Sequence, residues 1–491
     1  MPDIDDEMPS GSSRANRSIN AALDKYDLVL DRTGRAFAIS KHEPNPIALL
    51  VRGSAFKKVL RKDAHSGGDL LRHDDLTLIV EDLSAHAAIH DEHVDIYLRV
   101  GPSKVGGIEI DLGTPTRERV HLHDGKADIL ESGSQTLFYR SETLKPLPLP
   151  APQGDWRPLL PFLNMAEEDQ YLLIAWMTYC LSHFKYSGAA YPILVVKGEH
   201  GTGKSTLCRY VIRGLVDNNA SDVQMFPRDQ KDLLITSANQ HVVIYDNLRS
   251  LSSGWSDTLC IACTGGSLSS RTLYTDAEET LIPIHTPLVL NGIHGFISEA
   301  DLASRTVGIT LTRLSDVQRR ADSDLAGTLA KLQPAIFRGL LDLTAQTLAT
   351  LPDVQPRFRT RMTEFTRWLA ALEPAMGLQT ETLQDLYYRN VLASKLDTLT
   401  ENSLAMAIIR FAKDSGTSGW SGTPTDLLNE LGELVGPKIA NQSRQWPQNP
   451  NSMSKRLKVL AGTLEEQGVL LEFRHTTTRM IDVRYTGPEK G

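Results

Sequence analysis

The chain has 491 residues, enough for two to four domains, and its 41% hydrophobic and 23% charged residues are ordinary for a globular protein. No stretch approaches the roughly 20 consecutive apolar residues that a membrane span needs, which argues against a membrane protein. The net charge of −8 argues against a protein that coats DNA by charge alone. Any contact with nucleic acid must therefore come from local basic clusters or from a pore shared between subunits.

The N-terminal part of the chain predicts a tail followed by a small domain. Residues 1–24 begin with a polar, acidic stretch and predict a disordered tail on a cytoplasmic protein, without the basic start and apolar run of a signal peptide. Residues 25–150 carry short alternating runs broken by Gly, Asp and Pro, which predict a β-rich domain. The predicted strands lie near 26–30, 94–100, 107–112 and 136–139. A Pro-rich stretch at 146–152 indicates a linker, and 151–190 reads as a helical linker or collar.

From residue 191 the pattern changes to apolar strands that alternate with helices, which is typical of a parallel α/β core. The predicted core covers 191–315, and its strands lie at 193–196, 242–244, 288–290 and 307–311. Residues 316–436 predict a helical lid and linker. The last segment, 437–491, predicts a separate domain, because 451–486 reads as helix, helix, strand, turn, strand, the order of a winged helix.

The clearest motif follows the first core strand and matches the phosphate-binding pattern G-x4-G-K-[ST] in its required strand–loop–helix context. Its residues are Gly198, Glu199, His200, Gly201, Thr202, Gly203, Lys204 and Ser205, followed by Thr206. The glycines allow backbone N–H groups to surround phosphates, and the helix N-terminus adds a positive dipole end. We expect Lys204 to contact the β- and γ-phosphates and Ser205 to bind Mg²⁺. The sequence therefore predicts ATP and Mg²⁺ as cofactors.

A second motif lies about forty residues further on, where an apolar strand ends in Asp246 and Asn247. Asp246 is the predicted Mg²⁺ residue beside the phosphate loop, as the acid of a Walker B strand. Many hydrolases have Glu at the following position, and an amide cannot take a proton from the attacking water. Asn247 is expected to orient that water, and slow hydrolysis stays an open interpretation.

The order of these elements resembles the AAA+ class, and within it the superfamily-3 helicases of viruses and plasmids and the poxvirus-type primase-helicases of phages. The strand at 288–290 ends in Asn291, similar to the asparagine that contacts the γ-phosphate. Residues 265–274 resemble the stretch that leads into a pore-facing hairpin, and Arg271 there is a candidate DNA contact. Residues 301–305 resemble the segment that holds an arginine finger, which implies that Arg305 serves the ATP site of a neighbouring subunit. The end of the chain resembles the winged-helix tail of bacterial mobile-element ATPases.

The resemblance covers roughly residues 94–485 and implies a homo-oligomeric ring, expected to be a hexamer, built on an AAA+ P-loop core. One departure concerns the hairpin tip at 275–279, which is acidic where helicases of this class generally offer Lys or His to the DNA backbone. Like charges at a pore tip repel phosphates. Contacts through Arg271, or through Arg249 in the preceding loop, would then have to compensate.

Basic residues near the C-terminus predict a DNA-binding surface. Lys455, Arg456 and Lys458 share one predicted helix, and Arg474 and Arg479 lie on or beside the predicted wing. A winged helix with a basic helix and wing commonly reads duplex DNA. A protein-contact module remains the alternative for this segment.

Other candidate residues give weaker signals. Cys260 and Cys263 form a C-x-x-C without a second ligand pair, so core packing is the preferred interpretation. Asp95 and Asp111 lie on predicted strands like the paired acids of a primase, but no partner motif follows them.

Two classes of function remain at this point. The first is an ATP-hydrolysing ring motor on single- or double-stranded DNA, either a helicase or a replication initiator of a mobile genetic element. The second is an ATP-driven regulatory or defence switch that controls a protein partner. Stimulation of ATP turnover by single-stranded DNA favours the first, and dependence on a protein partner favours the second.

Overall fold

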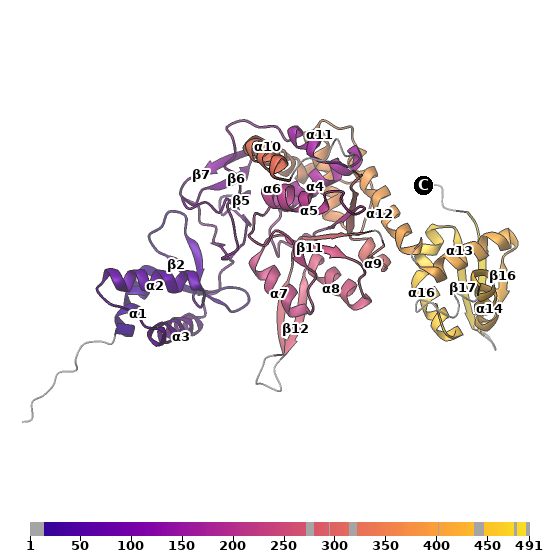
Figure 1. The fold of residues 1–491 in the computed structure, drawn as a ribbon, viewed down its shortest axis with the longest axis horizontal. Helices are drawn as coiled ribbons and strands as arrows, with labels where there is room; N and C mark the ends of the chain where they lie inside the picture. Colours follow the sequence, from indigo (N-terminus) through magenta and orange to yellow (C-terminus); the bar gives the residue numbers. More distant parts are fainter. Residues whose placement is uncertain are drawn as a thin grey trace, which may run out of the picture.

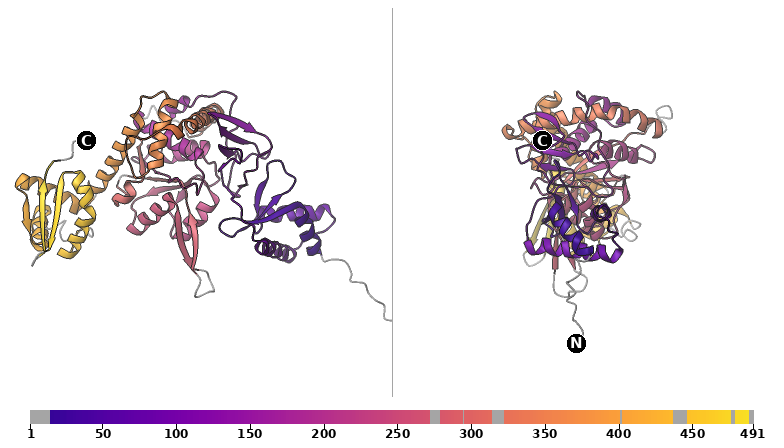
Figure 2. Two further views of the ribbon diagram at one scale, coloured as in Figure 1. Left: turned by 180° about the vertical axis from the view of Figure 1, so that it is seen from behind. Right: turned by 90° about the vertical axis from the view of Figure 1, so that its left-hand side faces the viewer.

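The computed structural model describes residues 14–271, 279–293, 295–313, 322–400, 402–436, 446–475 and 479–487. These residues form three bodies in a row, which are an N-terminal region, a central core and a C-terminal unit (Figure 1, Figure 2). Within the described ranges, no helix is long and apolar enough to cross a membrane.

The N-terminal region contains two four-stranded sheets. The first has the order β1-β2-β3-β8, with β1 (Tyr26–Leu30), β2 (Ala36–Ser40), β3 (Ile47–Leu50) and β8 (Phe138–Tyr139). The second is antiparallel in chain order, with β4 (Val100–Pro102), β5 (Ile108–Asp111), β6 (Arg119–His123) and β7 (Lys126–Leu130). Three helices share a hydrophobic cluster with the first sheet: α1 (Arg14–Lys25), α2 (Ser54–Ser66) and α3 (His73–His90).

The structure corrects the sequence prediction in this region at three points. Helix α1 occupies residues that were predicted to belong to a disordered tail. Helices α2 and α3 were not predicted, and in α3 the exposed Leu78 blurs the helical spacing of its buried residues. Residues 94–99 do not form the predicted strand, because the run bends where Arg99 turns into a buried ion pair with Asp217.

The core is a five-stranded parallel sheet in the order β10-β11-β14-β9-β15. Its strands are β9 (Ile193–Lys197), β10 (Gln224–Met225), β11 (Val243–Leu248), β14 (Leu288–Gly292) and β15 (Thr306–Thr310). Leu194 and Val196 belong to one hydrophobic cluster, whereas Ile193 and Val195 belong to another. A parallel sheet covered on both faces needs continuous apolar strands, and this explains why the sequence predicted β9, β11, β14 and β15. The two-residue strand β10 was not predicted.

Helices connect and cover the strands of the core. They are η1 (Arg157–Phe162), α4 (Glu167–Ser182), α5 (Lys204–Thr206), η2 (Leu207–Ile212), α6 (Arg213–Leu215), α7 (Gln230–Asn239), α8 (Ser253–Thr264) and α9 (Ala300–Ala303). A two-stranded hairpin, β12 (Gly266–Arg271) with β13 (Glu279–Ile284), projects from the core (Figure 1). The predicted acidic tip falls almost entirely on residues 272–278, which lie outside the described residues.

A helical layer follows the core and carries the chain to the C-terminal unit. It consists of α10 (Asp322–Thr350), η3 (Leu351–Asp353), α11 (Thr363–Met376) and α12 (Thr382–Thr400). Helices α10 and α11 pack with α4 in the larger hydrophobic cluster, which also contains the core strands β9 and β15. Helix α12 contacts α4 and β15 and ends where the C-terminal unit begins.

The C-terminal unit has its own hydrophobic cluster. Its elements are α13 (Ser403–Ser415), η4 (Gly416–Ser418), β16 (Trp420–Gly422), α14 (Pro424–Val435), α16 (Pro450–Glu466), β17 (Val469–His475) and β18 (Arg479–Tyr485). The three strands form a sheet in the order β16-β18-β17. The predicted boundary at residue 437 falls inside this unit. One helix, not two, lies between residue 451 and the first strand of the hairpin. In the described part of the unit, α13 and α14 precede residue 437.

Candidate nucleotide site

The phosphate-binding pattern occupies the end of β9 and the start of a helix, as predicted. Segments α5, η2 and α6 run without a break from Lys204 to Leu215. Gly198 has a φ of 154°, and a Cβ there would lie 2.7 Å from Thr202 Oγ1 and 3.1 Å from the Leu311 carbonyl oxygen. Only glycine therefore fits the first position of the loop.

Two side chains, those of Lys204 and Asn164, donate hydrogen bonds to backbone carbonyl oxygens of the phosphate loop. Lys204 Nζ donates to the carbonyl oxygens of Gly198 and Glu199, both at 2.8 Å. Asn164 Nδ2 donates to the carbonyl oxygens of Thr202 at 2.8 Å and of Thr312 at 2.9 Å. Asn164 lies in a loop before α4, and no sequence motif marked it.

Ser205 and Asp246 meet across the site although 41 positions separate them. Ser205 Oγ donates to Asp246 Oδ2 at 2.7 Å. Burial lowers the pKa of Lys204, while the negative charge of Asp246 acts in the opposite direction. The predicted metal residues and the predicted phosphate-binding lysine thus share one electrostatic environment.

A β-bulge explains how Asp246, Asn247 and Asn291 come together. Tyr245 pairs with Leu290 and Leu248 with Gly292, so two residues of β11 face a single residue, Asn291, of β14. Bulges of this kind redirect side chains and recur beside active sites. Asn247 has a φ of 61°, in the left-handed region, and its N–H donates to Asp246 Oδ1 at 2.7 Å. The strand register therefore aims Asp246 at Ser205 and leaves Asn247 exposed.

Asn291 is fully buried between the phosphate loop strand and the Asp246 strand. Its exposed fraction is 0%, and neither its Oδ1 nor its Nδ2 atom has a hydrogen-bond partner within the described residues. Buried polar groups are nearly always paired, so an orphaned amide beside a phosphate loop indicates a ligand-facing role. An amide in this position can contact a phosphate oxygen with its N–H₂ group.

The donor set fits Mg²⁺ bound together with a nucleotide. A carboxylate and a hydroxyl are the hard oxygen ligands that Mg²⁺ prefers, and this ion usually keeps few protein ligands beside phosphate oxygens and water. No group of three or more His, Cys, Asp or Glu residues suited to a metal occurs in the described part of the chain. Asp246 and Ser205 would hold the ion, and Lys204 with the loop N–H groups would hold the phosphates.

Arg305 lies at the amino ends of the strands of the same sheet, opposite to the phosphate loop at their carboxyl ends. It directly precedes β15, which is parallel to β9 and pairs Thr306 with Ile193, so Arg305 is at the amino end of the strands. The phosphate loop leaves the carboxyl end of β9, about 16 Å away along five residues of strand. Arg305 contacts Asp301, with Nε 3.5 Å from Oδ2, and its side chain is 14% exposed. The structure therefore does not bring Arg305 to the phosphate loop of its own chain.

The predicted DNA-contact residues of the C-terminal unit are distributed over α16 and the β17–β18 hairpin. Lys455, Arg456 and Lys458 are exposed on α16. Arg479 donates to Asn451 Oδ1 at 3.2 Å, beside the start of that helix. Arg474 instead forms an ion pair with Asp482, whose pKa it lowers. Arg271 is the last residue of β12, and only its backbone is among the described parts of the structure.

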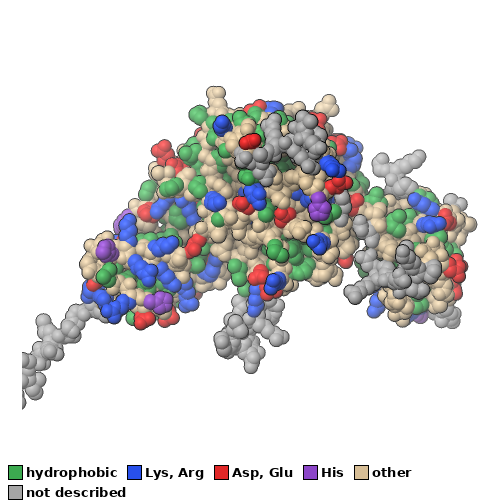
Figure 3. Space-filling view, viewed as in Figure 1, with side chains coloured by type: hydrophobic (Ala, Val, Ile, Leu, Met, Phe, Trp, Pro, Cys, Tyr) green, Lys and Arg blue, Asp and Glu red, His purple; other side chains and the backbone are tan. Residues whose placement is uncertain are grey.

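A second basic surface was missed by the sequence analysis. Residues 14–66 contain eleven Lys and Arg against five Asp and Glu, in a chain whose net charge is −8. Helix α2 alone carries Lys57, Lys58, Arg61 and Lys62. Figure 3 shows Lys and Arg side chains gathered over the N-terminal region. The run at 57–62 is the sequence signal that could have identified this surface.

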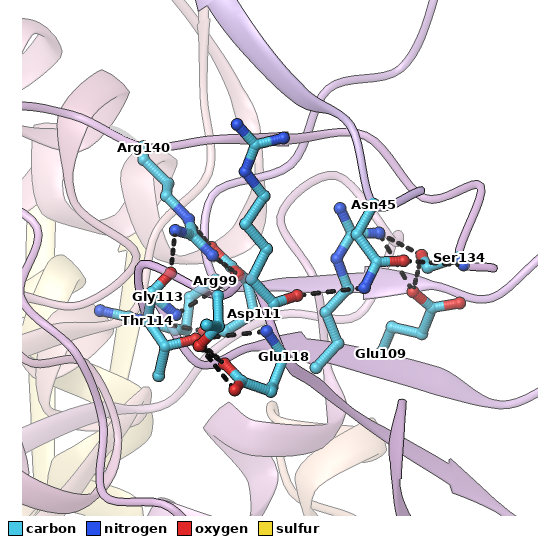
Figure 4. A network of polar contacts seen from close by, with 12 residues as sticks. Asn45, Arg99, Glu109, Asp111, Gly113, Thr114, Glu118, Ser134 and Arg140 are labelled. Atoms are coloured by element: carbon cyan, nitrogen blue, oxygen red, sulfur yellow. Dashed lines mark hydrogen bonds and ion pairs between the residues drawn. The ribbon is translucent and has the colours of Figure 1, made fainter. Parts of the chain in front are cut away.

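The two acids with primase-like positions are engaged by arginines. Asp111 accepts hydrogen bonds from Arg140 Nε at 2.8 Å and Nη2 at 2.6 Å. The Asp111 side chain is fully buried and belongs to a network of polar contacts (Figure 4). Asp95 forms an ion pair with Arg32 at 2.5 Å. The two carboxylates thus serve separate ion pairs. The predicted core role of Cys260 and Cys263 agrees with their burial on α8, which raises the pKa of both thiols to about 12.

Two family models match the chain. Residues 158–398 match the replication protein of actinomycete integrative conjugative elements, and residues 404–490 match the C-terminal domain of that protein, RepA. No curated protein matches the sequence. Solved structures of the NrS-1 C-terminal region match at 10% identity. One has a TM-score of 0.41 and covers 95% of this chain and 98% of that chain, and another has a TM-score of 0.39 with 96% and 98% covered.

Proposed function

We propose that this chain, a replication protein of the actinomycete integrative-conjugative-element family, is an ATP-hydrolysing AAA+ ring motor that acts on DNA as a helicase or replication initiator. One observation carries the proposal. The bulge in β11 aims Asp246 at Ser205 of the phosphate loop and sets both beside the orphaned amide of Asn291. A carboxylate, a hydroxyl and a buried amide around a phosphate loop are among the parts that nucleoside triphosphate hydrolysis uses.

Each residue has a role that follows from its chemistry. Lys204 exchanges its two hydrogen bonds to loop carbonyls for the β- and γ-phosphates, so the loop opens as the nucleotide enters. Mg²⁺, when bound, neutralises charge that develops on the phosphates. Asp246 and Ser205 hold the ion, and Asn291 donates to a γ-phosphate oxygen. Asn247 is exposed next to Asp246 and orients the attacking water, which leaves the site without a strong general base and makes hydrolysis slow.

The position of Arg305 supports a ring. A cation that stabilises the transferring phosphoryl group must lie near the γ-phosphate, and Arg305 is at the far edge of its own sheet. It can serve only a site on a neighbouring copy of the chain. Ring assembly with the ATP site between subunits, in the expected form of a hexamer, satisfies this requirement.

The order of elements in the C-terminal unit supports a winged helix, with α16 as the helix that enters the major groove and β17–β18 as the wing. Lys455, Arg456 and Lys458 on α16 are then the main phosphate and base contacts. Arg479 contributes at the start of the helix, whereas Arg474 is held by Asp482 and contributes less. The C-terminal unit would therefore load the motor onto DNA.

Mixing two inactive variants tests the motor and the ring together. Lys204→Ala should weaken ATP binding and lower turnover at least ~100-fold, because positioned charges at transition states have effects of that size. Arg305→Ala should bind ATP but hydrolyse it poorly. Mixed rings of the two variants should regain activity at interfaces with an intact loop and an intact Arg305. Lys331→Ala, an exposed lysine on α10, is the matched control. Normal turnover by Lys204→Ala would overturn the proposed site, and mixed rings without rescue would overturn the role of Arg305.

The alternative function, a switch that controls a protein partner, is separated by the response of ATP turnover to DNA. The family match favours the motor, because a replication protein works on DNA. Single-stranded DNA should stimulate turnover several-fold. Turnover that is indifferent to DNA in assembled rings would favour the switch instead.

A further inference from the structure

A cleft of about 420 Å³ lies between the N-terminal region and the core. Ligand sites are commonly 300–1,000 Å³ and occur preferentially at domain interfaces. From the N-terminal region, the turn between β1 and β2, the bend before β4, and β8 line the cleft. From the core, the segment before β9, the end of α7 and the base of β13 line it. Figure 1 shows the N-terminal region on the side of the core that carries α7 and the β12–β13 hairpin.

The cleft is distinct from the phosphate loop. Its core residues Lys185 and Tyr186 precede β9, and His241 precedes β11, so it lies at the amino ends of the parallel strands. The phosphate loop leaves the carboxyl end of β9. With five residues of strand between them, the two sites are about 16 Å apart.

Three tyrosines line the cleft, each with an arginine or another ring beside it. The guanidinium of Arg32 lies 4.5 Å from the centre of the Tyr186 ring. Arg35 lies 5.9 Å from the centre of the Tyr139 ring. Tyr97 packs edge-to-face on Phe184, outside the set of lining residues, with ring centres 5.3 Å apart. Tyrosine rings and guanidinium planes are the groups on which nucleobases stack.

The charges that line the cleft suit an anion. The lining includes Arg32, Arg35 and Lys185 but one carboxylate, Asp31. Asp31 is already saturated, since its oxygens accept from the Thr33 N–H and hydroxyl and from the Arg35 N–H and Nε, all within 2.9 Å. Arg32 is paired with Asp95, which adds a second carboxylate beside the cleft. Lys185 is therefore the cation of the lining that has no carboxylate in direct contact among the ion pairs of the described residues.

Lys185 is the buried cation of the cleft. It is 8% exposed, and its Nζ donates to the carbonyl oxygens of Ser237 at 2.5 Å and Gln240 at 2.6 Å. An ammonium has three donors, so one donor remains for a ligand. Burial lowers the pKa of Lys185 to about 7, and an anion in the cleft would restore the charge.

We propose that this cleft is a second nucleotide-binding site, in which a base stacks among Tyr97, Tyr139 and Tyr186 and a phosphate binds Lys185 and Arg32. The same chemistry occurs in a free nucleotide and in one unit of a DNA strand. The base of the β12–β13 hairpin lines the cleft through Ile282 and Pro283, which favours a strand that runs along the hairpin. The choice of source rests on the proposed motor function, whereas the site itself does not.

The experiment uses the full-length chain with the phosphate loop disabled by Lys204→Ala. Two probes are bound to it: a fluorescent ADP analogue and a labelled oligothymidylate of about twelve nucleotides. Added to this background, Arg32→Gln with Tyr186→Leu should weaken binding of one probe about tenfold, since both side chains are exposed and their loss spares the core. Lys104→Gln, an exposed charge in the turn between β4 and β5, is the matched control and should bind both probes like the background. Lys185→Met tests the buried cation, with its melting temperature recorded alongside.

The two probes separate the sources of the ligand. Weaker binding of the oligothymidylate assigns the cleft to a DNA strand, and weaker binding of the ADP analogue assigns it to a free nucleotide. Unchanged binding of both probes by the Arg32→Gln, Tyr186→Leu variant overturns the proposal. Failure of the motor function is detected independently, as normal ATP turnover by Lys204→Ala alone. With the loop intact, the cleft variant should keep basal ATP turnover.

Discussion

The two outer bodies of the molecule are joined to the core in different ways. On the N-terminal side, Arg99 Nε donates to Asp217 Oδ1 at 3.1 Å, and these side chains are 0% and 3% exposed. Arg213 and the N–H of Val242, at the start of the Asp246 strand, contact the same carboxylate. On the C-terminal side, the link is α12 and an ion pair at the surface, Lys395 with Glu466.

This difference assigns the β4–β7 sheet of the N-terminal region to the same folding unit as the phosphate loop. Residues of β4, β5 and β6 share the larger hydrophobic cluster with α4 and the core strands. The Pro-rich stretch predicted as a linker is also packed, because Leu147 is 3% exposed and its N–H donates to the Leu112 carbonyl. The C-terminal unit, in contrast, has a separate cluster and can move as a body. The C-terminal unit is therefore expected to unfold in a thermal transition separate from that of the core.

Breaking the buried ion pairs should have the largest effect. Asp217→Ala leaves Arg99 and Arg213 as buried cations without a carboxylate, which should cost about 3–5 kcal/mol of unfolding free energy. Calorimetry should show the transition of the N-terminal region and core at a much lower temperature and the C-terminal transition unchanged. Asp414→Ala, which removes an exposed partner of Arg410, is the control and should change little. Equal shifts of both transitions after Asp217→Ala would contradict the division into two units.

The second largest difference between the core and the C-terminal unit is expected in the pH dependence of their stability. Burial lowers the pKa of His183, His241 and His285 to about 4, against an ordinary value of 6.5. Between pH 6.5 and pH 4 these histidines are protonated in the unfolded state but neutral in the folded state. The free energy of unfolding therefore falls as the pH falls from about 6.5 to about 4. Each histidine lowers the free energy of unfolding by about 1.4 kcal/mol per pH unit below about 6.5, which amounts to about 2 kcal/mol at pH 5.

The measurement is the melting temperature as a function of pH. The transition of the N-terminal region and core should decrease, and His285→Asn should flatten its pH dependence. The C-terminal transition should follow less, because His475 in that unit is exposed. His42→Asn, another exposed histidine, is the control and should leave both curves in place. An identical pH dependence in His285→Asn and the wild type would refute the buried-histidine explanation.

Removing residues 403–491 should change DNA binding more than stability. The remaining chain keeps the larger hydrophobic cluster and the phosphate loop, so the first transition and the proposed basal ATP turnover should be retained. Duplex affinity should fall about tenfold, and the salt-sensitive part should be lost because phosphate contacts disappear with α16. Equal duplex binding by both proteins at several salt concentrations would favour a protein-contact role for the C-terminal unit.

The smallest effect is expected at the surface ion pair itself. Lys395 and Glu466 are 23% and 38% exposed, and such pairs contribute at most about 1 kcal/mol. Lys395→Gln and Glu466→Gln, alone and together, should give a small coupling energy in a double-mutant cycle. A coupling of several kcal/mol would mean that the C-terminal unit is fixed and not hinged.

Local patterns in the sequence predicted the parts of this protein that are local in structure. The strand at 193–196, the phosphate loop and the following helix are adjacent in the chain, so their geometry is encoded within one short segment. The apolar run of β14 was also readable, because parallel strands are buried on both faces, and β15 was readable from its apolar Val307 and Ile309. The predicted roles of Lys204, Arg305 and the basic residues of α16 stay predictions.

The rest depends on how distant segments pair. The bulge opposite Asn291 exists only because β11 and β14 adopt one register, and a single strand's sequence does not reveal its partner's offset. Asn164 supports the loop across 38 positions, and Arg99 reaches Asp217 across 118. The sequence did not reveal that the C-terminal unit begins at α13, because α13 and α14 are far along the chain from the β17–β18 hairpin with which they share a hydrophobic cluster.

The orphaned amide of Asn291 bears on how such a protein can be made more robust. An unpaired buried polar group lowers the stability of the free protein by about 1–3 kcal/mol, and only a ligand can recover that energy. An apolar residue of similar size would pack in the same space without the penalty. Screening variants for heat resistance would therefore favour replacing Asn291, and the proteins selected would be more stable in storage but would lose the contact with the γ-phosphate that we propose for Asn291.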